Sequence, residues 1–206
     1  MASGAARGVE RLDVGMTFRL VYQGPLPSSR SATPRDKQSI RRFLHPQLRE
    51  LWTQPPLREL AQLGALTEGS VTMPSLLVPR GKFRFVPLVT ARLKLMCHLD
   101  ILFLRPGTPG SVITQGGDVD NRVKTLFDAL QLPDLNQVTD DGPAEAETPH
   151  FFCLLEDDAL VTRVNVETDR LLTPDVDTVG QSRTVLIIGV TLKATELTWA
   201  NMELVG

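Results

Sequence analysis

Two hydrophobic periods divide this chain into predicted strands and helices. Residues 16–23 and the stretch LVTRVNVET (160–168) alternate apolar and polar positions, which predicts two half-buried strands. The run 83–107 is the most strand-like segment, and it predicts one long strand or two short ones around Pro87. Near the C-terminus, RTVLIIGVTLKATEL (183–197) predicts a more fully buried strand.

A basic segment that begins near residue 31 has the spacing of an amphipathic helix. Pro34 suits the first turn of such a helix, and Thr33 or Ser31 can cap it. Pro46 is expected to kink or break the helix, because proline removes an internal hydrogen bond. The apolar stripe of this helix is formed by Ile40, Phe43, Leu44 and Leu48.

The segment GGDVDNRVKTLFDAL (116–130) predicts a second helix with charged residues at its start. Asp120, Lys124 and Asp128 lie four residues apart along one edge of its apolar stripe. We expect Asp118 to end an extended segment and Asp120 to cap the helix, so that both carboxylates point to one place. The stripe itself is formed by Val123, Leu126, Phe127 and Leu130.

These elements predict an α+β fold, with a mixed or antiparallel sheet of about four strands packed with two main helices. We expect one domain over residues 16–200, preceded by a flexible N-terminal tail of residues 1–15. Two segments look like insertions in that domain. The first, 54–82, is punctuated by Pro and Gly, and the second, 134–150, is acidic and turn-rich and is expected to be a mobile loop.

Charge is distributed unevenly along the 206 residues, although the net charge is only −2. That total lacks the basic signature of a nucleic-acid-binding domain, so any such function must rest on local surfaces. Seven basic and two acidic residues occupy 30–58, whereas eight acidic residues and no Lys or Arg occupy 134–158. We therefore expect these two segments to face different partners.

The composition is that of a cytoplasmic protein. Cys97 and Cys153 stand apart in apolar runs and form no C-x-x-C pair, which argues against a structural zinc and fits a reducing compartment. The N-terminus lacks the apolar region of a signal peptide, and no apolar run is long enough to span a membrane. We therefore expect no membrane association. No Gly-rich phosphate-binding loop occurs either, so we expect no small-molecule cofactor.

The neighbouring carboxylates of Asp118 and Asp120 suggest a metal centre. Two carboxylates held close together repel each other unless one is protonated or a cation lies between them. Oxygen ligands suit Mg²⁺, with Mn²⁺ able to substitute. The acidic turn 156–158 lies between two apolar segments and can supply a third carboxylate. Lys124 would then stabilise charge on a phosphate bound nearby.

Simpler structural roles account for each of these residues taken singly. Asp118 and Asp120 can be helix caps, because Asp is among the best N-cap residues. Lys124 can form an i, i+4 pair with Asp120, and the turn 156–158 can be a solvated surface feature. Spacing and residue type leave both interpretations open.

Two motifs in this order, DVDNRVKTLFDAL and EDDALV, resemble those of the RusA-type Holliday junction resolvases. That family has an Asp-x-Asp-Asn-x-x-Lys segment running into Phe-Asp-Ala-Leu, and then a turn before a strand that reads Asp-Asp, Ala or Ser, any residue and Val. The charged and amide positions that match are Asp118, Asp120, Asn121, Lys124, Asp157 and Asp158. The resemblance is strong over these two motifs and loose over residues 83–195.

The resemblance implies a homodimeric, Mg²⁺-dependent endonuclease acting on branched DNA, most of all Holliday junctions, in recombination and repair. Lys124 would assist at the scissile phosphate, and Asn121 would orient the start of the helix. The implied metal ligands are Asp118, Asp120, Asp158 and, as a further carboxylate, Asp157. The side chains expected to contact DNA are Arg41, Arg42 and Lys124.

Several features depart from this family and leave other functions open. The chain is longer than typical members, and 54–82 and 134–150 look like additions. Acidic residues near the site would repel DNA unless they bind metal or fold away, so phosphate contacts would fall on the basic segment 30–58. The alternatives are a module that grips branched DNA without cutting it, a nuclease for another structured nucleic acid, and a calcium-binding or assembly domain.

Overall fold

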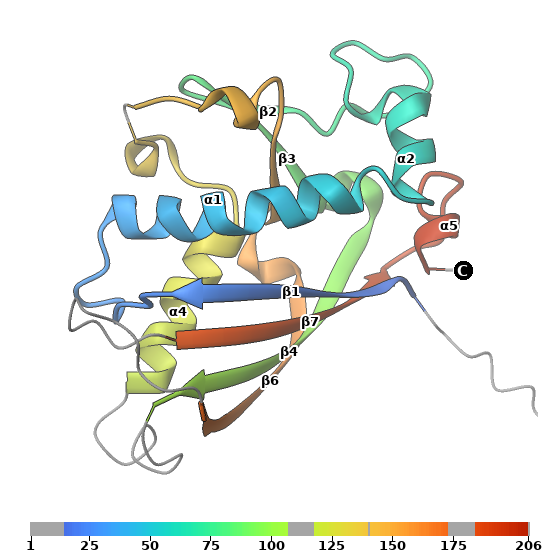
Figure 1. Ribbon diagram of the computed structural model, residues 1–206. Coiled ribbons are helices and arrows are strands. Elements are labelled where there is room, and N and C mark those ends of the chain that lie inside the picture. Colours follow the sequence, from blue (N-terminus) through green and yellow to red (C-terminus); the bar gives the residue numbers. More distant parts are fainter. Residues whose placement is uncertain (1–14, 107–117, 140, 173–183, 206) are drawn as a thin grey trace, which may run out of the picture.

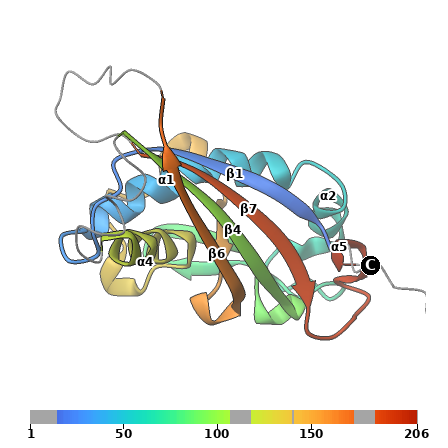
Figure 2. The same cartoon turned by 90° about the horizontal axis from the view of Figure 1, so that it is seen from below.

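The computed structural model describes residues 15–106, 118–139, 141–172 and 184–205, and for Asp118 it describes the backbone only. The described chain has an α+β fold with two sheets (Figure 1). The long helices α1 (Pro34–Leu51) and α4 (Asp118–Leu130) lie on one face of the larger sheet. Figure 2 shows the opposite face of that sheet, which no described helix covers.

The larger sheet has four strands in the order β1-β7-β4-β6. β7 lies antiparallel to both β1 and β4, whereas β6 runs parallel to β4 at one edge. Burial alternates along β4 and β7, because one face packs on the core and the other faces outward. The strands are β1 (Thr17–Gly24), β4 (Leu95–Arg105), β6 (Val161–Arg170) and β7 (Thr184–Ala194).

A second sheet of three strands was not expected from the sequence. It has the order β2-β3-β5, from β2 (Val78–Arg80), β3 (Phe83–Val89) and β5 (Phe151–Leu155). The run 83–107 does contain two strands, but it breaks at Thr90–Lys94 rather than at Pro87. Lys94 adopts a left-handed conformation with φ 53°, which turns the chain from one sheet into the other.

Both main helices are confirmed. Thr33 caps α1 through a capping box with Asp36. The expected break at Pro46 is wrong, because α1 continues through Pro46 to Leu51. The buried side chains on either side of that proline, Leu44 and Leu48, pack into one core and hold the helix together.

The remaining elements are short. They comprise α2 (Leu57–Leu60), a π-helical turn (Ala61–Ala65), α5 (Met202–Val205) and 3₁₀ turns at Ala91–Leu93, Leu135–Gln137, Glu145–Glu147 and Asp158–Leu160. Buried residues of 54–82, such as Leu57 and Met73, join the main core. Among the described residues, no helix has the length and apolar character needed to cross a membrane.

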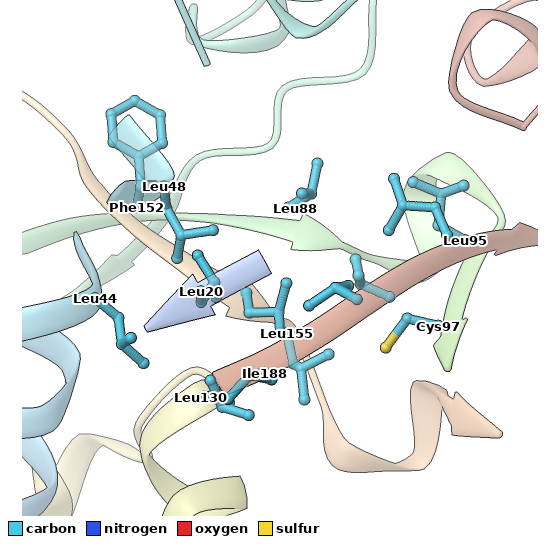
Figure 3. Packing of buried hydrophobic residues seen from close by; sticks show 14 of the residues in the cluster. Leu20, Leu44, Leu48, Leu88, Leu95, Cys97, Leu130, Phe152, Leu155 and Ile188 are labelled. Carbon is cyan, nitrogen blue, oxygen red and sulfur yellow. The ribbon is translucent and has the colours of Figure 1, made fainter. Parts of the chain in front are cut away.

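The main core lies between the helices and the four-stranded sheet (Figure 3). Leu44 and Leu48 of α1 approach Leu130 of α4, Leu155 of β5 and Ile188 of β7 there. Burying each such side chain contributes roughly 1.5–3 kcal/mol. The thiols of Cys97 and Cys153 are also buried, and burial raises the pKa of each to about 12, so both stay protonated.

Candidate functional site

The start of α4 is anchored to the loop that follows β1. The backbone N–H of Ser29 donates to the carbonyl oxygen of Asn121 at 3.0 Å, and the Ser29 hydroxyl donates to Asn121 Oδ1 at 3.1 Å. The guanidinium of Arg122 donates to the carbonyl oxygen of Leu26. Asn121 and Arg122 therefore fix the position of the helix start, which is the role expected for Asn121.

Two of the charged residues predicted for the site face solvent on this anchored helix. Asp120 and Lys124 are exposed one turn apart, and neither side chain forms a hydrogen bond or ion pair with the described part of the chain. Asp128, the next residue in the same row, is paired instead with Lys37 of α1 at 2.7 Å. The helix thus presents a carboxylate and an ammonium group together at its exposed first turns.

The helix begins earlier than expected. Its first residue is Asp118, so Asp120 lies in the first turn and is not the cap. The expectation that Asp118 ends an extended segment is therefore wrong. The direction of its side chain, and hence its predicted role as a metal ligand, lies outside the described residues.

The acidic turn 156–158 lies between β5 and β6 and is held in place by hydrogen bonds. Glu156 accepts hydrogen bonds from the Thr90 hydroxyl and, at 3.0 Å, from the N–H of Ala91, so its carboxylate holds the neighbouring 3₁₀ turn. Asp157 accepts from the N–H of Ala159 at 2.8 Å. The side chain of Asp158 is exposed. Asp157 and Asp158 are therefore the members of this turn that are accessible to a ligand.

A cleft of about 740 Å³ opens beside this turn. Its wall contains the exposed carboxylates of Asp157, Asp158 and Asp134, with Arg80 and Arg92. Arg92 is held in place because its guanidinium donates to the carbonyl oxygen of Ser75 at 2.6 Å. The two arginines were missed in the sequence, since only long-range folding brings them to the acidic turn.

Asp120 and the acidic turn 156–158 lie at opposite ends of α4. The N–H of Asp158 donates to Gln131 Oε1 at 3.1 Å, and Gln131 directly follows the last residue of the helix. Asp120 lies eleven residues before Gln131, which corresponds to about 16 Å along a helix axis. One Mg²⁺ or Ca²⁺ ion binds oxygen ligands at only about 2.0–2.6 Å. A single chain therefore does not bring Asp120 together with Asp157 or Asp158.

The rest of the described chain likewise offers no set of ligands for one metal ion. Across residues 15–106, 118–139, 141–172 and 184–205, no three His, Cys, Asp or Glu side chains gather closely enough to hold a metal ion. Among the described side chains, Asp120, Asp157 and Asp158 therefore do not form one metal centre within a single chain.

The two arginines expected to contact DNA both form hydrogen bonds or ion pairs within the protein. Arg41 is only 2 % exposed, and its guanidinium donates to the carbonyl oxygens of Asp128 and Gln131. The prediction that Arg41 binds DNA is therefore wrong. Arg42 is partly exposed but pairs with Asp141 at 2.7 Å and with Glu147 at 2.8 Å.

The acidic segment 134–150 supplies the groups that bind the basic residues in the middle of α1. Arg42 binds Asp141 and Glu147, Arg49 donates to the carbonyl oxygen of Ala146 at 2.8 Å, and Glu147 is buried. The described part of the segment is thus held against α1, so it is not the free loop that we expected. Its carboxylates neutralise the middle of the basic helix and leave Arg30 and Arg35 exposed near the helix start.

No protein-family model, curated protein or solved structure matches this chain. The features that bear on function are therefore the two sequence motifs and the geometry at the two ends of α4. That geometry combines an exposed Asp120–Lys124 pair at one end with an acidic, arginine-flanked cleft at the other.

Proposed function

We propose that this protein binds branched DNA and cleaves its phosphodiester bonds in a metal-dependent reaction, in the manner of the RusA-type Holliday junction resolvases that its motifs resemble. The observation that carries the proposal is the exposed pair of Asp120 and Lys124 on an anchored helix start. A rigid support of this kind is what a phosphate-handling site requires, because small misplacements weaken catalysis strongly.

The chemistry of the two side chains fits a phosphodiester substrate. The ammonium group of Lys124 is free to meet a phosphate oxygen and to stabilise charge that develops on it. The carboxylate of Asp120 supplies the oxygen ligands that Mg²⁺ prefers. Arg30 and Arg35, exposed at the same end of the molecule, supply positive charge for the flanking DNA backbone.

The deciding experiment is cleavage of a labelled four-way junction, with linear duplex and flap DNA as controls. Reactions would contain Mg²⁺, Mn²⁺, Ca²⁺ or EDTA. The variants are Asp120→Asn and Lys124→Ala, with Glu203→Gln as a matched control because Glu203 is an exposed carboxylate on the distant helix α5. We expect paired cuts with Mg²⁺ or Mn²⁺, loss of cutting in both site variants, and wild-type cutting in Glu203→Gln.

A second candidate function is a module that grips branched DNA without cutting it. The separation of Asp120 from Asp157 and Asp158 within one chain favours this candidate. Tight, salt-sensitive junction binding in Ca²⁺ with no cutting in any metal would select it over the nuclease. Neither binding nor cutting of any of the DNAs would remove both candidates.

A further inference from the structure

A second cleft, of about 680 Å³, opens between the start of α1 and the segment that follows α4. Its α1 wall contains Arg35, Gln38 and Ser39, and the facing wall contains Asn136 and Val138. This α1 cleft shares no lining residue with the cleft beside the turn 156–158. Its volume lies within the range of small-molecule binding sites.

The side chain of Gln38 is the feature of the α1 cleft that points to a ligand. Gln38 is only 2 % exposed, yet its Nε2 has no hydrogen-bond partner in the described chain. A buried amide group without an acceptor costs free energy, and nearly all buried polar groups in folded proteins are paired. An unpaired amide in the wall of a cleft therefore indicates that a bound group completes its hydrogen bonds.

Arg41 fixes which end of the Gln38 amide is available. The Nη1 of Arg41 donates to Gln38 Oε1 at 3.5 Å, and the same guanidinium is held by the carbonyl oxygens of Asp128 and Gln131. A guanidinium group can only donate, so the amide must turn its oxygen toward Arg41. The –NH₂ end of Gln38 is left for the cleft, and it requires an acceptor atom on the ligand.

Positive charge lies at the mouth of the same cleft. Arg35 is exposed, and its side chain forms no hydrogen bond or ion pair with the described residues. It lies in the first turn of α1, where the helix dipole also favours an anion. The mouth of the cleft is therefore suited to a phosphate group.

The carboxylate in the cleft wall, Asp141, is already paired. The neighbouring Thr139 hydroxyl and the Arg42 guanidinium lower the pKa of Asp141 to about 2, and Arg42 lies at 2.7 Å from it. Asp141 is thus ionised at neutral pH, but Arg42 balances its charge. The unpaired charge of the wall is the cation of Arg35.

The remaining lining groups suit a flat ring with polar edges. Asn136 is exposed, and its amide, without a side-chain partner in the described chain, offers both a donor and an acceptor. Asn and Gln amides are the side chains that match the edges of nucleobases. Pro34 and Val138 add apolar surface to the two walls. A phosphate alone would meet Arg35 but would leave the Gln38 amide unpaired, whereas a base supplies the missing acceptor.

We propose that the α1 cleft binds a single nucleotide, with its phosphate at Arg35 and its base against the amides of Gln38 and Asn136. An unpaired nucleotide of branched DNA is the source that we assign, and this assignment rests on the proposed function. Ser29, which is bonded to Asn121 at the start of α4, lies four residues before Thr33 in the cleft wall. Four residues span at most about 14 Å. A strand that passes Asp120 and Lys124 therefore reaches the cleft within about five stacked nucleotides.

Nuclear magnetic resonance titration of the full-length protein tests the cleft without any use of nuclease activity. The probes are dAMP, dCMP, dGMP, dTMP and inorganic phosphate, each added to millimolar concentration, and the readout is the side-chain amide signals of Gln38 and Asn136. The variants are Gln38→Met, which keeps the volume and removes the donors, and Arg35→Ala. Arg19→Ala is the matched control, because Arg19 is an exposed arginine on β1 outside the α1 cleft.

We expect at least one mononucleotide to bind the wild type more tightly than inorganic phosphate and to shift both amide signals. Gln38→Met and Arg35→Ala should each weaken this binding about tenfold, and Arg19→Ala should leave it unchanged. Gln38→Met should unfold in urea at or above the wild-type midpoint, because it removes an unpaired buried amide. Equal affinity for phosphate and all four mononucleotides would overturn base recognition. Binding that is absent, or unchanged in Gln38→Met, would overturn the cleft itself.

DNA binding distinguishes the two sources of the nucleotide. Four-way junctions with fully paired arms are compared with junctions that carry one unpaired nucleotide near the branch point. If the nucleotide belongs to the DNA, the wild type prefers the second junction about tenfold, and Gln38→Met loses this preference while still binding the first. A protein that binds mononucleotides but shows no such preference has a site for a free nucleotide, and the assignment to branched DNA is rejected.

These readouts separate the inference from the function on which its DNA assignment rests. A protein that binds and cuts no DNA, but binds a mononucleotide through Gln38, removes the nuclease and keeps the cleft. A protein that cuts junctions, but shows no amide shifts with any mononucleotide, keeps the nuclease and removes the nucleotide site.

Discussion

Arg41 of α1 donates a hydrogen bond to the carbonyl oxygen of Asp128 in the last turn of α4, and its Nε donates to the carbonyl oxygen of Gln131 at 3.3 Å. The last carbonyl groups of a helix have no partners within the helix and carry its negative dipole end. The buried guanidinium therefore caps α4 and joins it to α1. Lys37 adds a second link through its ion pair with the Asp128 carboxylate.

Replacing Arg41 with Leu should destabilise the protein by about 1–3 kcal/mol, because two partly buried carbonyl groups would lose their charged donor. Arg41→Lys should be intermediate, since an ammonium group cannot reproduce the two divergent donors. Urea unfolding measures both changes. Arg35→Ala is the control on the same helix, because Arg35 is exposed. An Arg41→Leu protein as stable as Arg35→Ala would contradict the capping role.

This contact also shows what the sequence could and could not reveal. Periodicity predicted α1, α4 and the four strands of the larger sheet, because each of those signals is local. It could not reveal that Arg41 turns inward, since an arginine on an amphipathic helix is normally solvated. Asp120 was expected to cap the second helix but lies in its first turn, and its distance from Asp158 depends on the path of the intervening chain.

The second sheet was missed for a related reason. Continuous apolar runs such as β5, which is buried at every position, show no period to identify them as strands. The turn at Thr90–Lys94 carries no Gly or Pro, so the break between β3 and β4 was assigned to Pro87.

Arg42→Ala should release the described residues of the acidic segment from α1. Arg42 binds the carboxylates of Asp141 and Glu147 and, at 2.9 Å, the carbonyl oxygen of Gly142. We expect amide hydrogen exchange to rise in peptides covering 141–147 and to remain unchanged in β4. Arg58→Ala is the control, because Arg58 forms only an exposed ion pair with its neighbour Glu59. Unchanged exchange in 141–147 would show that other contacts hold this segment.

His45 should make the folded state sensitive to acid. Its Nδ1 accepts from the N–H of Phe152 at 2.9 Å, and its ring stacks on Phe151 with 4.6 Å between the ring centroids. Burial lowers the pKa of His45 below its ordinary value. The unfolded chain therefore binds a proton at a higher pH than the folded chain, so the free energy of unfolding falls as the pH drops below about 6.5.

Urea unfolding at about pH 7.5 and about pH 5.5 measures this loss. His45→Gln should be less stable than the wild type at the higher pH, because it loses the stacked ring, but it should lose less further stability on acidification. His98→Gln is the control. The side chain of His98 forms no hydrogen bond with the described residues and is only partly buried, so its replacement should leave most of the acid sensitivity in place. A His45→Gln protein with the full wild-type acid loss would assign that loss to other groups.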